Sequence, residues 1–108
     1  MKISILALQY GQANDCEQYI SKLIGLLSDN GLDVNSVTKA RYFEDDFLIF
    51  LKYAEKISSY MLILNADKRA KEVLGAAPSD IYTSYSSCEI AFIDTDDQGI
   101  KLFEDMVL

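Results

Sequence analysis

Histidine and tryptophan are absent from this chain of 108 residues, and proline occurs only once. Without histidine, the chain by itself provides no Ser-His-Asp triad, no imidazole general base and no imidazole metal ligand. The two cysteines, Cys16 and Cys88, match neither a CxxC redox motif nor the spacing of a zinc site. We therefore expect each cysteine to be a small buried apolar residue.

Long hydrophobic runs and positive charge are also scarce. The apolar opening, residues 1–8, is too short to cross a membrane or to act as a secretory signal, so we interpret it as the first strand of a cytoplasmic protein. Asp and Glu outnumber Lys and Arg by 17 to 10, which gives a formal net charge of −7. Such a charge repels phosphate backbones and anionic lipid, so neither nucleic acid nor a membrane is an expected partner.

The length and composition are those of one globular domain over residues 1–108, either free-standing or the N-terminal domain of a longer protein. Half of the residues are hydrophobic and a quarter are charged. These proportions are ordinary for a globular protein, and the size allows one apolar core without disulfides or metal. No repeat, low-complexity segment or linker divides the chain.

Apolar runs alternate with amphipathic segments along the sequence. Strands are expected over residues 2–9, 32–38, 60–64, 81–85 and 89–93. Helices are expected from a cap near Asn14 to a stop at Gly31, from Glu44 to Ile57, from Lys68 to Leu74, and after a capping pattern at Thr95. Asp67 is expected to cap the third of these helices and Gly75 to end it.

This order of elements predicts a three-layer α/β/α fold with a mostly parallel central sheet, because strands that alternate with helices form right-handed crossovers. The runs 2–8 and 60–64 are expected to be central strands, with Leu62 and Leu64 almost fully buried. The pattern does not specify the order of the strands in the sheet.

Two candidate sites follow the first and last strong strands, where parallel sheets bind ligands. Gly11 and Gln12 follow the first strand, but their turn lacks both GxGxxG and GxxxxGK[ST], so a plain connection is the favoured interpretation. Asp94 follows the last strand and is a candidate ligand-binding residue. The acidic run 44–46 is a candidate for a hard cation, although acids in the first turn of a helix also complement its dipole, and we expect no metal there.

The third candidate site follows the strand over 60–64. Asn65 and Asp67 occupy the loop, and Lys68 begins a small basic cluster with Arg69 and Lys71. These residues are candidates to hold an anionic group at the sheet edge. A solvated face of the short helix is the favoured alternative.

Several strings resemble the molybdenum-cofactor-biosynthesis (MoCF, molybdopterin-binding) domain, particularly the N-terminal domain of CinA-type competence/damage-inducible proteins. Gly11-Gln12-Ala13-Asn14 and Asn30-Gly31-Leu32-Asp33-Val34 are similar to the family's Gly-Gln loop and Gly-x-x-Val helix end. The run 60–65 resembles its "DLVILTGG" strand, and residues 98–108 resemble its last helix. The resemblance spans nearly the whole chain and implies an MoCF-like sheet in a shortened form.

The departures from the family concern its ligand-binding motifs. The Gly-Gly-x-Gly loop after Leu64 is absent, since Asn65-Ala66-Asp67 stands there. Arg41-Tyr42 replaces the family's Gly-Asp, and Asp94-Thr95 replaces its Pro-Gly turn. No ligand-contacting motif is left to transfer to this chain.

We therefore expect a degenerate molybdopterin-binding-like domain that acts as a non-catalytic binding or assembly module, with no catalytic residue and no cofactor. The alternative is an active CinA/MoCF-type domain that binds molybdopterin or a nucleotide phosphate, with Mg²⁺, at the carboxyl edge of the sheet. A receiver-like signalling domain is disfavoured, because Gln9-Tyr10 and Asn65 stand where its acidic residues are required.

A homodimer is the expected assembly. MoCF-type domains form dimers or trimers, and the resemblance implies the same here. Independently, the shortened loop after Leu64 is expected to expose an apolar patch near Ile81, Tyr82, Tyr85 and Phe92. Patches of this kind are usually covered by a partner, so residues 76–92 are expected to contribute to the interface.

Overall fold

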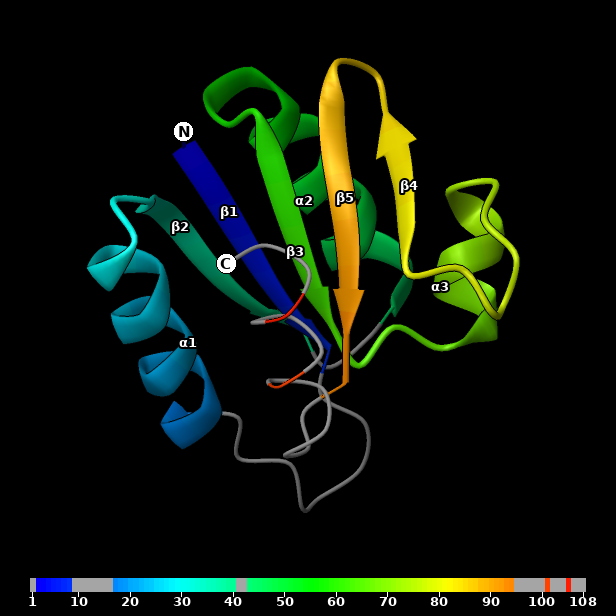
Figure 1. The fold of residues 1–108 in the computed structure, drawn as a ribbon. Coiled ribbons are helices and arrows are strands. Elements are labelled where there is room, and N and C mark those ends of the chain that lie inside the picture. The colour runs from blue at the N-terminus through cyan, green and yellow to red at the C-terminus, as the bar shows by residue number, and fades with distance from the viewer. Residues whose placement is uncertain (1, 9–16, 41–42, 95–100, 102–104, 106–108) are drawn as a thin grey trace.

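The computed structural model of the chain describes residues 2–8, 17–40, 43–94, 101 and 105 (Figure 1). Its elements are β1 (Lys2–Leu8), α1 (Glu17–Asp29), β2 (Asp33–Ala40), α2 (Phe43–Ile57), β3 (Tyr60–Leu64), α3 (Lys68–Val73), β4 (Tyr82–Tyr85) and β5 (Cys88–Ile93). These bounds confirm the five predicted strands and the first three predicted helices. The last predicted helix lies outside the described residues, apart from Lys101 and Asp105, which are helical.

The five strands form one sheet in the order β2-β1-β3-β5-β4. β1 pairs in parallel with β2 and β3, and β3 pairs in parallel with β5. β4 at the edge is antiparallel to β5, because only Ser86 and Ser87 separate them and a parallel pair needs a much longer crossover. The structure therefore confirms a mostly parallel sheet.

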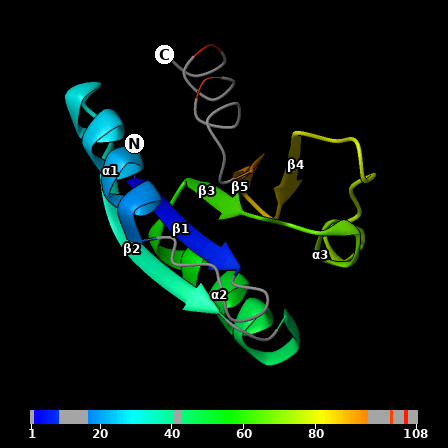
Figure 2. The ribbon, with the colours of Figure 1, turned by 90° about the horizontal axis from the view of Figure 1, so that it is seen from below.

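The two faces of the sheet are covered by different helices. α1 packs through Ile20, Leu23 and Leu27 against the face that carries Leu62 and Leu64. α2 and α3 pack against the opposite face, and Figure 2 shows α1 and α2 on opposite sides of β1 and β2. Residues on β3 alternate between the two faces, and both leucines are fully buried as predicted.

Glycines in the left-handed region end two helices, as the sequence predicts. Gly31 follows α1 with φ of 75°, and the Leu32 amide donates to the Leu27 carbonyl at 2.9 Å. Gly75 follows α3 with φ of 74°, and the Ala76 amide donates to the Lys71 carbonyl at 2.8 Å. These bonds are typical of helix C-termini closed by a residue at positive φ.

The edge strand β2 contains a bulge at Asn35. Val34 pairs with Ile3, but the next residue of β1, Ser4, pairs with Ser36. The extra residue Asn35 donates from its side-chain amide to the Ile57 carbonyl at 2.7 Å, which links the bulge to the end of α2. A bulge disturbs the free edge of a strand and makes pairing with a further strand less favourable.

Candidate functional site

The carboxyl edge of the sheet between β1 and β3 is the candidate site. The chain leaves β1 toward β2 on one side and later returns to β3 on the other side, so the strand order reverses at this point. Ligands of parallel α/β proteins bind at such a reversal. The structure places Asn65 at the end of β3 and Asp94 at the end of β5, on the same edge. Gly11 and Gln12 lie outside the described residues.

Asn65 connects the ends of three strands at this edge. It adopts a left-handed conformation with φ of 60°, which asparagine tolerates better than most residues. Its backbone amide donates to the Ile93 carbonyl at 2.9 Å, and its side-chain amide donates to the Leu8 carbonyl at 3.4 Å. These two hydrogen bonds of Asn65 therefore serve the sheet itself.

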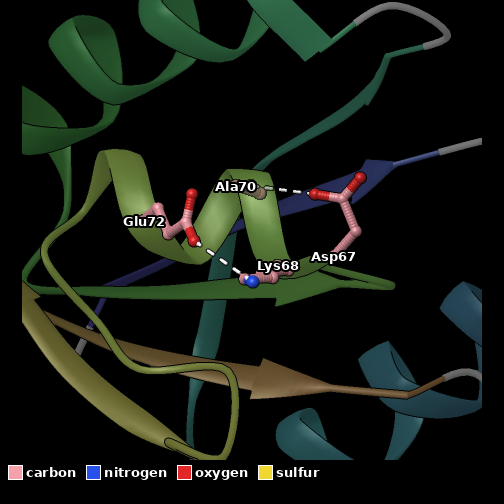
Figure 3. A network of polar contacts seen from close by, with 4 residues as sticks. All are labelled: Asp67, Lys68, Ala70 and Glu72. Atoms are coloured by element: carbon pink, nitrogen blue, oxygen red, sulfur yellow. Dashed lines mark hydrogen bonds and ion pairs between the residues drawn. The ribbon is translucent and has the colours of Figure 1, made fainter.

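Asp67 caps the N-terminus of α3, as the sequence predicts. Its Oδ1 accepts a hydrogen bond from the Ala70 amide at 2.8 Å (Figure 3). A carboxylate at this position complements the partial positive charge of the helix terminus. The same carboxylate repels a phosphate group, so it opposes anion binding at the start of α3.

Two basic residues of α3, Lys68 and Lys71, direct their charges to different places. Lys68 lies 3.9 Å from Glu72 in an exposed ion pair on the helix surface (Figure 3). The Lys71 ammonium donates to the carbonyls of Pro78 and Asp80, each at 2.8 Å. Lys71 Nζ also lies 5.0 Å from the centre of the Phe92 ring. Lys71 thus binds the turn before β4 rather than the loop after β3.

Asp94 is exposed, and its backbone joins α1 to the end of β5. The Tyr19 hydroxyl of α1 donates to the Asp94 carbonyl at 3.0 Å. A second link between α1 and the sheet is the ion pair of Glu17 with Lys39 on β2. These contacts place Asp94 at the candidate edge and give its main chain a structural role.

Polar residues at the opposite, amino edge form a network that the sequence analysis did not identify. Ser4 is fully buried, its hydroxyl lies 2.6 Å from that of Ser58, and it accepts from the Ser36 hydroxyl at 3.0 Å. The Cys88 thiol donates to the Ser58 carbonyl at 2.9 Å. The signal in the sequence is a serine inside the otherwise apolar run of β1. The network satisfies the polar groups where α2 ends.

Two titratable side chains have raised pKa values. Burial, followed by the nearby Glu55 carboxylate, raises the pKa of the Cys88 thiol. Cys88 is buried, as the sequence predicts, whereas Cys16 lies outside the described residues. Burial raises the pKa of Tyr60 to about 12, with smaller contributions from Tyr82 and Glu89. Both side chains stay protonated near neutral pH.

The described residues contain neither a cluster of metal ligands nor a membrane-spanning helix. Over the described residues, no three His, Cys, Asp or Glu side chains are grouped in a way that could hold a metal ion. The side chains of the acidic run 44–46 lie outside the described part. None of the described helices is long and apolar enough to cross a membrane.

Of the four residues expected at an apolar patch near β4, two are exposed and two are not. Ile81 and Tyr82 are exposed, but Phe92 is buried and packs against the α2 side of the sheet. Tyr85 is partly buried at the hairpin, which is the other end of β4 from Ile81. The most exposed large apolar side chains of the described residues lie on α2 instead.

Comparisons with known proteins identify no family for this chain. No family model matches the sequence, no curated protein matches it, and no solved structure matches its fold.

Proposed function

We propose that this domain is a non-catalytic binding or assembly module. In this proposal it is a degenerate MoCF-like domain with a three-layer α/β/α arrangement, in which Asn65-Ala66-Asp67 has replaced the glycine-rich ligand loop. The shared features are the quoted strings of the sequence and the parallel sheet with β1 and β3 at its centre.

The proposal rests on the way the chain itself uses the polar groups after β3. Phosphate-binding loops need backbone N–H groups that converge on the anion, and adjacent glycines allow this approach. Here the backbone amide of Asn65 donates to the Ile93 carbonyl, and the backbone amide of Ala70 donates to the Asp67 carboxylate. These two donors already have partners within the protein. A negative charge also occupies the start of α3, where the positive end of the helix would otherwise attract an anion.

Two described residues with potentially nucleophilic side chains, Ser4 and Cys88, support the same proposal. Ser4 and Cys88 are buried, and their hydrogen bonds are made to other groups of the amino edge. A raised pKa keeps the Cys88 thiol protonated, which lowers its nucleophilicity. The sequence contains no histidine to serve as a base for either residue.

Isothermal titration calorimetry against ATP, NMN and a molybdopterin analogue, each with and without Mg²⁺, tests the proposal. We expect dissociation constants no tighter than about 1 mM, because the backbone amides of Asn65 and Ala70 already have partners within the protein. The Asp67→Asn variant is the matched comparison, since asparagine also caps helices but has no charge. It is expected to bind somewhat more tightly than the wild type, because the charge that repels an anion is removed, but its dissociation constant should stay in the millimolar range. A micromolar dissociation constant for either protein would favour the alternative function, binding of a pterin or nucleotide at the carboxyl edge.

A further inference from the structure

The connection between α1 and β2 contains the one asparagine of the chain that is followed by glycine. Asn30 precedes Gly31, whereas Asn14, Asn35 and Asn65 precede residues that have side chains. Both residues of the pair are exposed. A side chain on the residue after an asparagine hinders attack by its backbone nitrogen on the asparagine side chain, and glycine has none. Asn30 is therefore the asparagine of this chain most open to reaction with its own main chain.

The chemistry available to this pair is intramolecular deamidation. The Gly31 backbone nitrogen attacks Cγ of Asn30, so that a bond between these two atoms forms and the bond from Cγ to Nδ2 breaks. The amide proton of Gly31 leaves with the Nδ2 group as ammonia. Water then opens the resulting succinimide ring. Opening at one carbonyl gives aspartate, and opening at the other gives isoaspartate, in which the main chain runs through Cγ. Water is the only co-reactant.

In the folded protein, hydrogen bonds hold both reacting groups. The Gly31 amide, which supplies the nucleophile, donates to the Ser28 carbonyl at 3.1 Å. The side-chain amide of Asn30, which contains the leaving group, donates to the Leu26 carbonyl at 2.8 Å. The nucleophilic nitrogen must lose its proton to attack, and a hydrogen bond to a carbonyl stabilises the protonated form. The closed end of α1 therefore slows the reaction.

The end of α1 opens more readily than the core of the domain. The backbone amides of Asn30 and Leu32 both donate to the Leu27 carbonyl, at 3.1 and 2.9 Å, and these bonds close the last turn. Hydrogen bonds at a helix terminus open locally at a lower free energy than that of global unfolding. In the open turn, the Gly31 nitrogen and the Asn30 side chain are both released from their acceptors.

We propose that Asn30-Gly31 is a site of self-modification, at which opening of the last turn of α1 permits deamidation of Asn30. The change is irreversible in water because the ammonia leaves. It uses no group of the carboxyl edge, so it goes beyond the proposed function and does not depend on it.

The products cannot re-form the original end of α1. Aspartate at position 30 has no donor for the Leu26 carbonyl, and its charge adds to that of Asp29 at the helix C-terminus, where the helix dipole is negative. Isoaspartate adds a carbon to the main chain between Leu27 and Leu32, which moves the two ends of their hydrogen bond apart. Because Leu27 is fully buried against the sheet, we expect modification to loosen the packing of α1.

Peptide mapping by mass spectrometry, on protein kept at mildly alkaline pH, tests the proposal. The folded wild type is expected to gain the mass of an amide-to-acid change at Asn30. Asn35 and Asn65 are internal controls, since their side-chain amides donate to the Ile57 and Leu8 carbonyls, and both should stay unchanged over the same period. In guanidinium chloride, which opens the helix, conversion of Asn30 should be at least about tenfold faster.

Gly31→Asn is the matched variant. Gly31 has φ of 75°, and asparagine is the residue that most often replaces glycine at such a helix end. A Cβ at position 31 would have no heavy atom within 4 Å beyond the neighbouring residues, so the side chain fits. It hinders the nitrogen, and conversion of Asn30 in denaturant should therefore be at least about tenfold slower than in the wild type. The comparison in denaturant excludes an effect of the fold.

Asn30→Asp reproduces one product directly. Hydrogen exchange at the Gly31 and Leu32 amides should be faster in this variant than in the wild type, whereas exchange in β3 should be unchanged. An Asn30 that stays intact in the folded protein to the end of the incubation would overturn the proposal, and so would one that converts no faster in denaturant. Equal rates for Gly31→Asn and the wild type in denaturant would contradict the assigned nucleophile. None of these results bears on the calorimetric test of ligand binding.

Discussion

Lys71 joins α3 to the turn before β4, and replacing it by methionine measures how much that link stabilises the fold. The ammonium donates to the Pro78 and Asp80 carbonyls at 2.8 Å and lies 5.0 Å from the centre of the Phe92 ring. A hydrogen bond to a charged group contributes about 1.5–3 kcal/mol, and a cation–π contact at a partly exposed site contributes about 0.5–1 kcal/mol.

The net loss in Lys71→Met should be smaller than the sum of these values. Water can reach the exposed Pro78 carbonyl after the substitution, and methionine retains the apolar stem that packs near Phe92. We therefore expect the free energy of unfolding to fall by about 1–2 kcal/mol. Equilibrium unfolding in urea gives this value, and cleavage of the 75–81 segment by a protease should become faster in the variant.

Lys68→Met is the matched control in the same helix. Lys68 makes only an exposed 3.9 Å ion pair with Glu72, and such pairs contribute about 0–1 kcal/mol. Its loss should change the free energy of unfolding by less than about 0.5 kcal/mol. Equal effects of the two substitutions, or no effect of Lys71→Met, would refute the stabilising role of the Lys71 contacts.

Three further predictions concern the core, the candidate edge and pH. Leu62→Ala removes a fully buried side chain of β3 and should lower the free energy of unfolding by about 2–5 kcal/mol in urea titrations; a loss below 1 kcal/mol would contradict the burial. Asn65 has φ of 60°, so Asn65→Ala should destabilise the fold by about 1–2 kcal/mol, whereas Asn65→Gly should cost less because glycine adopts this conformation freely. Both variants lose the side-chain bond to Leu8, so the difference between them reports the backbone conformation alone, and the opposite ranking would contradict the cost of positive φ at this position. The folded pKa of Tyr60, about 12, lies above its unfolded value near 10, so its contribution to stability is complete below pH 10 and is lost as pH rises through 12. Tyr60→Phe should flatten the pH dependence of chemical unfolding in that window, and an unchanged slope would contradict the assigned pKa.

Local patterns in the sequence predict the helices and strands well, because the spacing of apolar residues in a segment reflects which of its side chains are buried. The run 60–64 is apolar throughout, and β3 has the same bounds and is buried on both faces of the sheet. Asp67 and Gly75 mark the two ends of α3, since a cap and a positive-φ residue act within one helical turn. In these places the residues that define the structure are neighbours in the sequence.

The candidate site was predicted only in part. The sequence places Asn65, Asp67 and Asp94 after buried strands, and the structure brings Asn65 and Asp94 to one edge of the sheet. The sequence does not predict that the Lys71 side chain donates to the Pro78 carbonyl. Nor does it predict that Asn65 donates to carbonyls of β1 and β5. These hydrogen-bond partners depend on the order of the strands in the sheet, and the spacing of apolar residues along the sequence does not specify that order.

The sequence by itself determined where the strands and helices lie, which residues of β3 are buried and how α3 begins and ends. Only the tertiary structure decided the strand order β2-β1-β3-β5-β4, the hydroxyl network of Ser4, Ser36 and Ser58, and the exposure of Ile49 and Tyr53 on α2. The physical reason is the range of the interactions. Helix caps and hydrophobic periodicity depend on residues a few positions apart, whereas Ser4 and Ser58 are 54 residues apart and meet only after the sheet has assembled.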